Sequence, residues 1–158
     1  MPDIHNMNYV INEINAHFGY LFHDGIQIHK VFDRLAFGNW IVVLNSEKCV
    51  IRIIQDRRQI SLEAAPSWAS VDIKDSEHFT DLNLLVAYLE NKEKFSSVDK
   101  VSSSEDQFKN LGLLLKSHYE EIISFLTSDE YFKREEEIAL YHQKQIKKIF
   151  PNARFRHR

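Results

Sequence analysis

Three strand-like runs between Trp40 and Ala65 constrain the fold of this chain most strongly. The runs are WIVVLN, CVIRIIQ and ISLEA, and the polar breaks SEK and DRRQ separate them. Short β-branched runs joined by polar turns are typical of an antiparallel meander. Helical patterns precede and follow this stretch, so we expect an α+β domain with three to four strands.

The first turn decides which residues of the first two runs face one another. If residues 46–47 form a two-residue turn, Leu44 lies opposite Cys49. Side chains alternate along a strand, so one face of the meander then collects most of the apolar residues. We expect this face to be core, and its members are Trp40, Val42, Leu44, Cys49, Ile51, Ile53, Ile60, Leu62 and Ala64.

The second turn, at Arg57 and Arg58, places Arg52 directly opposite Glu63. This opposite face mixes charged residues with apolar ones and is too apolar to be wholly exposed. We therefore expect a helix, another strand or a partner to cover part of it. Its apolar members are Ile41, Val43, Val50 and Ile54.

An N-terminal helix precedes the meander. Apolar residues recur at intervals of three and four from Ile4 to Phe18, which places them on one helical face. Asp3 or Asn6 is suited to cap this helix, and Gly19 is suited to the left-handed position just past its end.

The remaining elements are one weak strand and three helices. Residues 25–32 alternate in the manner of an edge strand. Thr80 or Asp81 predicts the start of one helix, Ser103 or Ser104 the start of a second, and Ser128 the start of a third. The expected order is therefore a helix, a meander and three helices.

The whole chain, residues 1–158, fits one domain. We expect a mobile polar connection at about residues 95–105 and a frayed basic tail at residues 152–158. Charge is unevenly spread, because residues 1–132 hold 12 basic against 20 acidic side chains. Residues 133–158 hold 8 basic against 3 acidic side chains, so an acidic body ends in a basic helix and tail.

No catalytic, cofactor or metal motif is present. The chain lacks a G-x-S-x-G elbow and a glycine-rich phosphate loop, although an enzyme without a recognisable motif stays an alternative. His17, His23 and His29 are spaced by six, which does not put them on one helical face, and Cys49 is the sole cysteine. We expect no cofactor, no metal and, without a signal peptide or membrane span, a cytoplasmic protein.

A protein-contact surface is the function that the residues suggest first. Two arginines at a hairpin tip suit an interface, because guanidinium groups combine several donors with a flat apolar face. A tryptophan just after the last strand and an acidic stretch beyond it add an apolar contact and charge. The candidate residues are Arg52, Asp56, Arg57, Arg58, Glu63, Trp68, Asp72, Asp75 and Glu77.

The basic C-terminus suggests nucleic-acid binding as an alternative. No acidic residue follows Glu137, and two phenylalanines interleave with the cations. Such a segment would contact phosphates without regard to base sequence, although the acidic body would repel the same polymer. The candidate residues are Lys144, Lys147, Lys148, Arg154 and Arg156.

Residues 37–91 resemble small bacterial immunity-type proteins. The resemblance rests on the strand pattern FGNWIVVLNSEKCVIRIIQDRRQISLE, on its D-R-x-Q turn (Asp56, Arg57, Gln59), and on the following loop and helix FTDLNLLVAYLE. It implies a non-enzymatic cytoplasmic protein that binds and neutralises a cognate toxin. The helical segment from Phe108 onward lies outside the resemblance, and no catalytic residues carry over.

Overall fold

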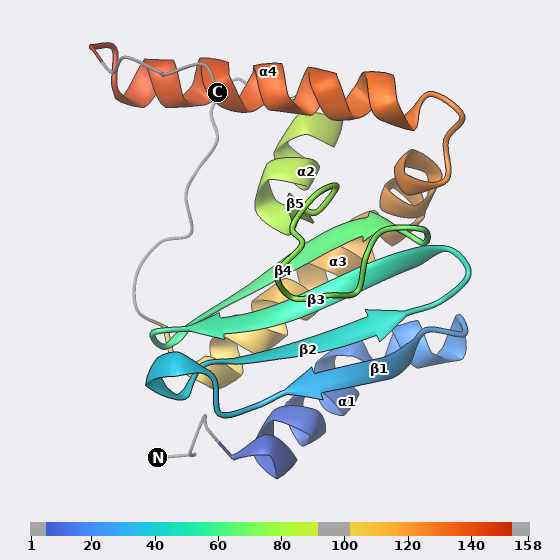
Figure 1. Ribbon diagram of the computed structural model, residues 1–158, viewed down its shortest axis with the longest axis vertical. Helices are drawn as coiled ribbons and strands as arrows, with labels where there is room; N and C mark the ends of the chain where they lie inside the picture. Colours follow the sequence, from blue (N-terminus) through green and yellow to red (C-terminus); the bar gives the residue numbers. More distant parts are fainter. Residues whose placement is uncertain (1–5, 92–101, 153–158) are drawn as a thin grey trace.

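Five antiparallel strands pair in chain order, β1-β2-β3-β4-β5, in the computed structural model, which describes residues 6–91 and 102–152 (Figure 1). The predicted edge strand is confirmed as β1, and a short 3-10 helix, η1 (Ala36–Gly38), precedes β2. The strands are β1 (Gln27–Phe32), β2 (Trp40–Asn45), β3 (Cys49–Asp56), β4 (Gln59–Pro66) and β5 (Thr80–Asp81).

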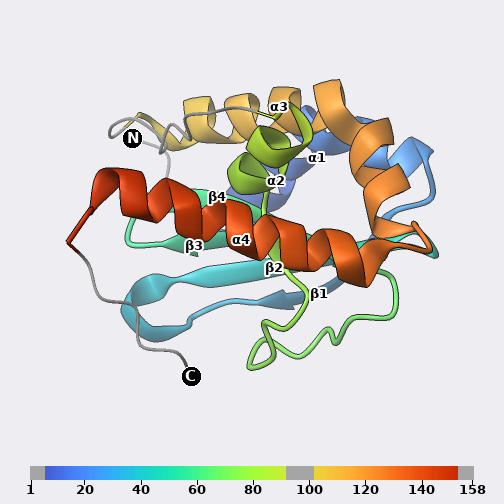
Figure 2. The same cartoon turned by 90° about the horizontal axis from the view of Figure 1, so that it is seen from above.

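The predicted α+β class is confirmed, with one helix before the sheet and three after β4. These helices are α1 (Met7–His23), α2 (Leu82–Leu89), α3 (Ser104–Leu126) and α4 (Tyr131–Ile149). α1 and α3 lie against the same face of the sheet, and α2 and α4 lie toward its β4 edge (Figures 1 and 2).

The core face of the meander is confirmed in full. All nine predicted residues belong to the buried cluster, together with apolar residues of all four helices. Within it, the indole of Trp40 stacks on the Phe108 ring of α3 at 6.1 Å between ring centres. The alternation of apolar residues was sufficient to identify this face, because a strand has only two faces.

The predicted register of the first hairpin is wrong by two residues. Leu44 pairs with Ile51 rather than Cys49, because the Ser46 amide donates to the Cys49 carbonyl and the turn residues are 47–48. A slide of two residues preserves the faces, so the apolar pattern cannot detect it. The second register is correct: Arg52 pairs with Glu63.

α1 does not end at Gly19, as the glycine suggested, but continues to His23 after a kink at Phe18, whose φ of −120° and ψ of 16° are not helical. Gly19 lies within the helix, and Gly25, with φ of +84°, adopts the left-handed conformation after its end. Asn6 caps the N-terminus by accepting from the Asn8 amide (3.0 Å). The alternative cap, Asp3, lies outside the described residues.

Two of the three later helices begin after a predicted capping residue, and the third does not. The carboxylate of Asp81 caps α2, and the hydroxyl of Ser103 accepts from the Asp106 amide to cap α3. Ser128 lies in the preceding turn instead, and α4 begins three residues later. Most of the expected mobile connection (95–105) and tail (152–158) lies outside the described residues, whereas Ser104 and Glu105 already belong to α3.

Cys49 lies in β3 with 1% of its surface exposed, and burial raises the pKa of its thiol to about 11. We expect the native thiol to react with a disulfide reagent at pH 8 about 100-fold more slowly than free glutathione, because so little thiolate is present. Absorbance of the released chromophore measures the rate, and unfolding in urea should restore the ordinary rate. A fast native reaction would contradict this assignment.

Candidate functional site

The connection between β4 and β5, residues 67–79 (the cover loop), lies on the sheet face opposite α1 and α3 (Figure 2). This loop covers the face that the sequence indicated was too apolar to stand exposed. Val43, Val50 and Ala65 on the sheet are each no more than 1% exposed. A loop, which was not among the expected covers, therefore covers the part of this face at Val43, Val50 and Ala65, whereas Ile41 and Ile54 are half-buried.

Arg52 holds the cover loop in place. Its guanidinium donates to the carbonyl oxygens of Asp72 (2.7 Å) and Asp75, and the Ser70 carbonyl lies at 3.5 Å. The guanidinium carbon also lies 3.6 Å from the centre of the Phe79 ring, in the geometry of a cation–π contact. One side chain of β3 thus contacts four positions along the loop.

The prediction that Arg52 contacts a partner is wrong, because this side chain is 2% exposed beneath the loop. Burial lowers the pKa of its guanidinium, and the carboxylate of Glu63 on the adjacent strand opposes that effect. Burial likewise raises the pKa of Glu63, while Arg52 lowers it. Arg52 therefore supports the fold beneath the candidate surface instead of forming it, whereas Glu63 is half-buried and its contact with a partner stays a prediction.

An aromatic cluster joins the cover loop to the start of α4. It consists of Trp68, His78, Tyr131 and Phe132, which we name the Trp68 patch. The centres of the Trp68 and Phe132 rings lie 5.4 Å apart, and those of Trp68 and His78 lie 4.8 Å apart. Trp68 is 54% exposed and Phe132 61% exposed, whereas Tyr131 is buried beneath them. Exposed aromatic rings supported by a buried one are typical of a protein-contact surface.

A carboxylate fixes the geometry of the Trp68 patch. Glu135 Oε2 accepts from the Tyr131 hydroxyl (2.6 Å) and lies 2.8 Å from His78 Nδ1. Burial, then this hydrogen bond, raises the pKa of Tyr131. A second carboxylate borders the patch, because Glu77 lies 3.7 Å from His78, and Asp72 is exposed elsewhere on the cover loop.

The sequence identified Trp68 but missed His78 and Phe132. One signal was available for Phe132, since it directly follows Tyr131 and adjacent helical residues cannot share one buried face. No signal was available for His78, because its contact with α4 joins residues more than 50 positions apart. Asp75, the other predicted acid of the loop, is half-buried and contributes its carbonyl to Arg52.

The Asp56–Gln59 tip forms a second exposed feature, the hairpin corner. Arg57 and Arg58 are exposed and have φ of +49° and +71°, in a region that non-glycine residues rarely adopt. Asn39 holds the tip: its amide donates to Asp56 and its oxygen accepts from the Arg57 amide, both at 3.1 Å. Phe37, with φ of +62°, is 81% exposed beside the Arg57 guanidinium (5.6 Å).

The hairpin corner does not lie beside Trp68, as the sequence suggested. The corner precedes β4 and Trp68 follows it, and the eight residues of β4 separate them by about 24 Å. The predicted contact residues therefore belong to two separate surfaces. Asp56, Arg57 and Arg58 belong to the corner, while Trp68 belongs to the patch, Glu77 borders it and Asp72 lies elsewhere on the cover loop.

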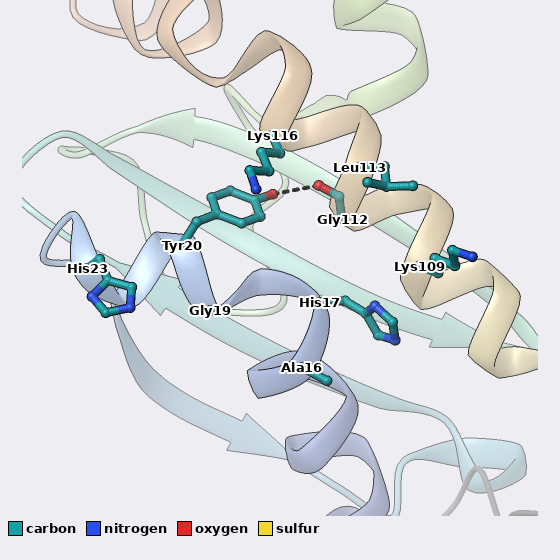
Figure 3. A pocket seen from close by; sticks show the side chains of 9 residues that line it. All are labelled: Ala16, His17, Gly19, Tyr20, His23, Lys109, Gly112, Leu113 and Lys116. Carbon is teal, nitrogen blue, oxygen red and sulfur yellow. Dashed lines mark hydrogen bonds between the residues drawn. The ribbon is translucent and has the colours of Figure 1, made fainter.

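A groove of about 490 Å³ lies between α1 and α3 (Figure 3). Its walls carry His17, His23, Lys109 and Lys116, and Tyr20 donates to the Gly112 carbonyl at 2.8 Å across its floor. Figure 3 shows these side chains spread along the groove rather than converging on one point. We therefore assign no ligand to it.

Asp24, at the end of α1, joins three elements. Lys48 of the first hairpin turn approaches both carboxylate oxygens at 3.0 Å, and Tyr119 of α3 donates to Oδ2. The Tyr119 hydroxyl, followed by Lys48, lowers the pKa of Asp24 below its usual 3.8. Burial, then the bond to Asp24, raises the pKa of Tyr119.

This network predicts an acid-dependent loss of stability. A carboxyl whose pKa is lower in the folded state stabilises that state above pH 4, and the contribution disappears as the pH falls through the folded pKa. Asp24→Asn should therefore destabilise the protein at pH 7 and have much less effect at pH 2.5, as measured by urea unfolding. Asp129→Asn, at an exposed carboxylate, serves as the control. An Asp24→Asn effect of equal size at both pH values would contradict the assignment.

The other predicted site residues lie on α4 or outside the described residues. Lys144, Lys147 and Lys148 are exposed on α4, and Arg154 and Arg156 lie outside the described residues. Among residues 6–91 and 102–152, no group of three or more histidine, cysteine or acidic side chains could hold a metal ion. Within the same residues, no helix is both long enough and apolar enough to cross a membrane.

Comparison of the chain with known protein families, with curated proteins and with solved structures found no match.

Proposed function

We propose that this chain is a small non-enzymatic binding protein that captures a basic protein partner through the Trp68 patch. The carrying observation is the pair of exposed rings, Trp68 and Phe132, held 5.4 Å apart over a buried tyrosine and bordered by carboxylates. Rigid aromatic side chains supply much of the binding energy of protein interfaces. The surrounding acidic groups would accelerate association with a basic partner.

Within this class, we propose an immunity protein of the cytoplasm that neutralises a cognate toxin. The resemblance of residues 37–91 supports this assignment, and so does the acidic balance of residues 1–132, since many toxins of this kind are basic nucleases. The hairpin corner, with Arg57 and Arg58, would form a second contact. If the product of the neighbouring gene neither forms a complex with this protein nor is neutralised by it in a growth assay, the immunity assignment is rejected.

The contribution of the patch is tested by Trp68→Ala. We expect the dissociation constant for the toxin to rise about 30-fold, which corresponds to about 2 kcal/mol for a central aromatic contact. Leu113→Ala is the matched control, because Leu113 is also 54% exposed but lies on α3 away from the patch. Calorimetry measures both constants. Equal effects of the two variants would show that the patch is not the contact surface.

The alternative proposal is a nucleic-acid-associated protein, and the exposure of Lys144, Lys147 and Lys148 along α4 supports it. Contacts with phosphates weaken steeply with salt. Deletion of residues 152–158 should then reduce salt-dependent retention on DNA or RNA. Unchanged retention in the deletion variant, or no retention by the full chain, rejects this alternative.

A further inference from the structure

Exposed apolar surface is concentrated on α4. Seven large apolar side chains are exposed among the described residues, and four of them lie on α4 or at its C-cap. These are Phe132 (61%), Leu140 (58%), Ile149 (56%) and Phe150 (61%). The C-terminal half of the helix extends past α2, so it lies at the outer side of the molecule (Figures 1 and 2).

Two of these exposed side chains, Phe132 and Phe150, form a stripe along the outer face of α4 together with Ala139 and Ile146, whereas Leu140 and Ile149 lie on other sides of the helix. Phe132, Ala139, Ile146 and Phe150 follow one another at intervals of seven, seven and four residues, which places them on one side of a helix. Phe132, Ala139 and Phe150 are exposed, and Ile146 is half-buried. The buried residues Tyr131, Ile138 and Gln145 lie on a different side. α4 thus has one apolar stripe toward its own domain and a second toward solvent.

Charge along α4 reverses at its midpoint. Residues 129–137 hold five acidic and two basic side chains, whereas residues 138–150 hold three lysines and no acidic residue. This order suits the helix dipole, but the dipole does not account for an exposed apolar stripe between the charges. Two such helices are complementary when they run antiparallel, because each acidic half then meets a basic half.

We propose that α4 is a dimerisation helix that pairs antiparallel with α4 of a second copy of this chain, about a twofold axis near residue 141. In a contact about a twofold axis, both copies contribute the same stripe of residues. It sets Phe132 against the partner subunit's Phe150, and Glu136 beside the partner subunit's Lys147. The helix is about 28 Å long, which makes the interface small and the dimer reversible.

The order of charges along α4 favours a second copy of this chain, in antiparallel orientation, over a membrane or a nucleic acid as the molecule that covers the stripe. An anionic membrane or a nucleic acid would meet the lysines of residues 138–150 but would be repelled by the acidic half. A parallel pair would set like charges against one another. The proposal rests on the stripe and the charge order of α4 and not on the proposed function. Phe132 belongs to both surfaces, however, so a dimer would compete with capture of a partner at the Trp68 patch.

Charge reversal tests the proposal. We expect sedimentation of the full chain to show a concentration-dependent dimer. Glu136→Lys alone and Lys147→Glu alone should each raise the dimer dissociation constant about tenfold or more, and the double variant should restore it. Glu120→Lys on α3, an exposed position, should have little effect. A monomer at all concentrations, or a double variant weaker than both singles, overturns the proposal.

Engineered cysteines test the orientation. The proposed axis places Ala139 beside the partner subunit's Gln143, so the variant Ala139→Cys/Gln143→Cys should form disulfide-linked dimers on oxidation. Ser117→Cys/Glu121→Cys has the same spacing on exposed positions of α3 and should remain uncross-linked. The native Cys49 is buried and does not interfere. Equal cross-linking of the two pairs overturns the antiparallel arrangement. Dimers that appear only with added vesicles or oligonucleotide overturn self-association.

Discussion

Arg52→Ala is expected to lower the free energy of unfolding by about 3 kcal/mol and to release the cover loop. The substitution removes the donor shared by the loop carbonyls, and it leaves the half-buried Glu63 without its cation. Urea unfolding measures the loss of stability. Amide hydrogen exchange measures the release, which should be confined to residues 67–79 and the neighbouring strand edges at low denaturant.

Two variants distinguish this account from a general effect of losing a cation. Lys74→Ala removes an exposed positive charge from the same loop and should change stability by no more than about 0.5 kcal/mol. Arg52→Lys keeps the charge but loses the planar fork and the stack on Phe79, so its effect should be intermediate. If Arg52→Lys matches the unsubstituted protein, the geometry of the guanidinium is not what holds the loop.

Gly112→Ala should lower the free energy of unfolding by about 2 kcal/mol, although alanine favours a helix more than glycine does. A Cβ atom at residue 112 would lie 2.5 Å from the carbonyl oxygen of His17, which belongs to the backbone of α1. Neither backbone can rotate away, so α1 and α3 must move apart. Thermal and urea unfolding measure the loss, and the hydrogen bond from Tyr20 to the Gly112 carbonyl should weaken with it.

Gly19→Ala is the matched control for this prediction. Gly19 also lies in a helix, but a Cβ atom there would meet nothing within 4 Å. The higher helical propensity of alanine should therefore increase stability, by up to about 1 kcal/mol. Opposite signs for the two substitutions would identify close helix packing at Gly112. A stabilising Gly112→Ala would show that α1 and α3 can separate without cost.

Local patterns in the sequence were sufficient for the sheet and its core face. Alternation in the three runs between Trp40 and Ala65 identified the buried residues, and the Arg57–Arg58 turn paired Arg52 with Glu63 correctly. The predicted register of the first hairpin was wrong because a slide of two residues keeps every side chain on its face of the sheet. α1 continues beyond Gly19 because burial of Leu21 in the last turn of the helix offsets the low helical propensity of glycine.

The candidate site was predictable only in part. Trp68 was recognised because it follows a strand in a polar segment, but two of its aromatic neighbours, Tyr131 and Phe132, come from α4, more than 60 residues later. The role of Arg52 was misjudged for a related reason. A charged residue in a strand is ordinarily exposed, and only the path of the cover loop determines that this one is enclosed.

The contacts of Arg52 have a consequence for how this surface can evolve. The three oxygens that it approaches, in Ser70, Asp72 and Asp75, belong to the main chain. Every amino acid has such an oxygen, so the contacts with Arg52 survive substitution of these residues. The side chains of Ser70, Asp72 and Asp75 also accept from loop amides, so the positions that are free to change are those without such a bond. Exposed loop residues such as Lys74 and Glu77 can then diverge, while Arg52 in β3 keeps the path of the loop.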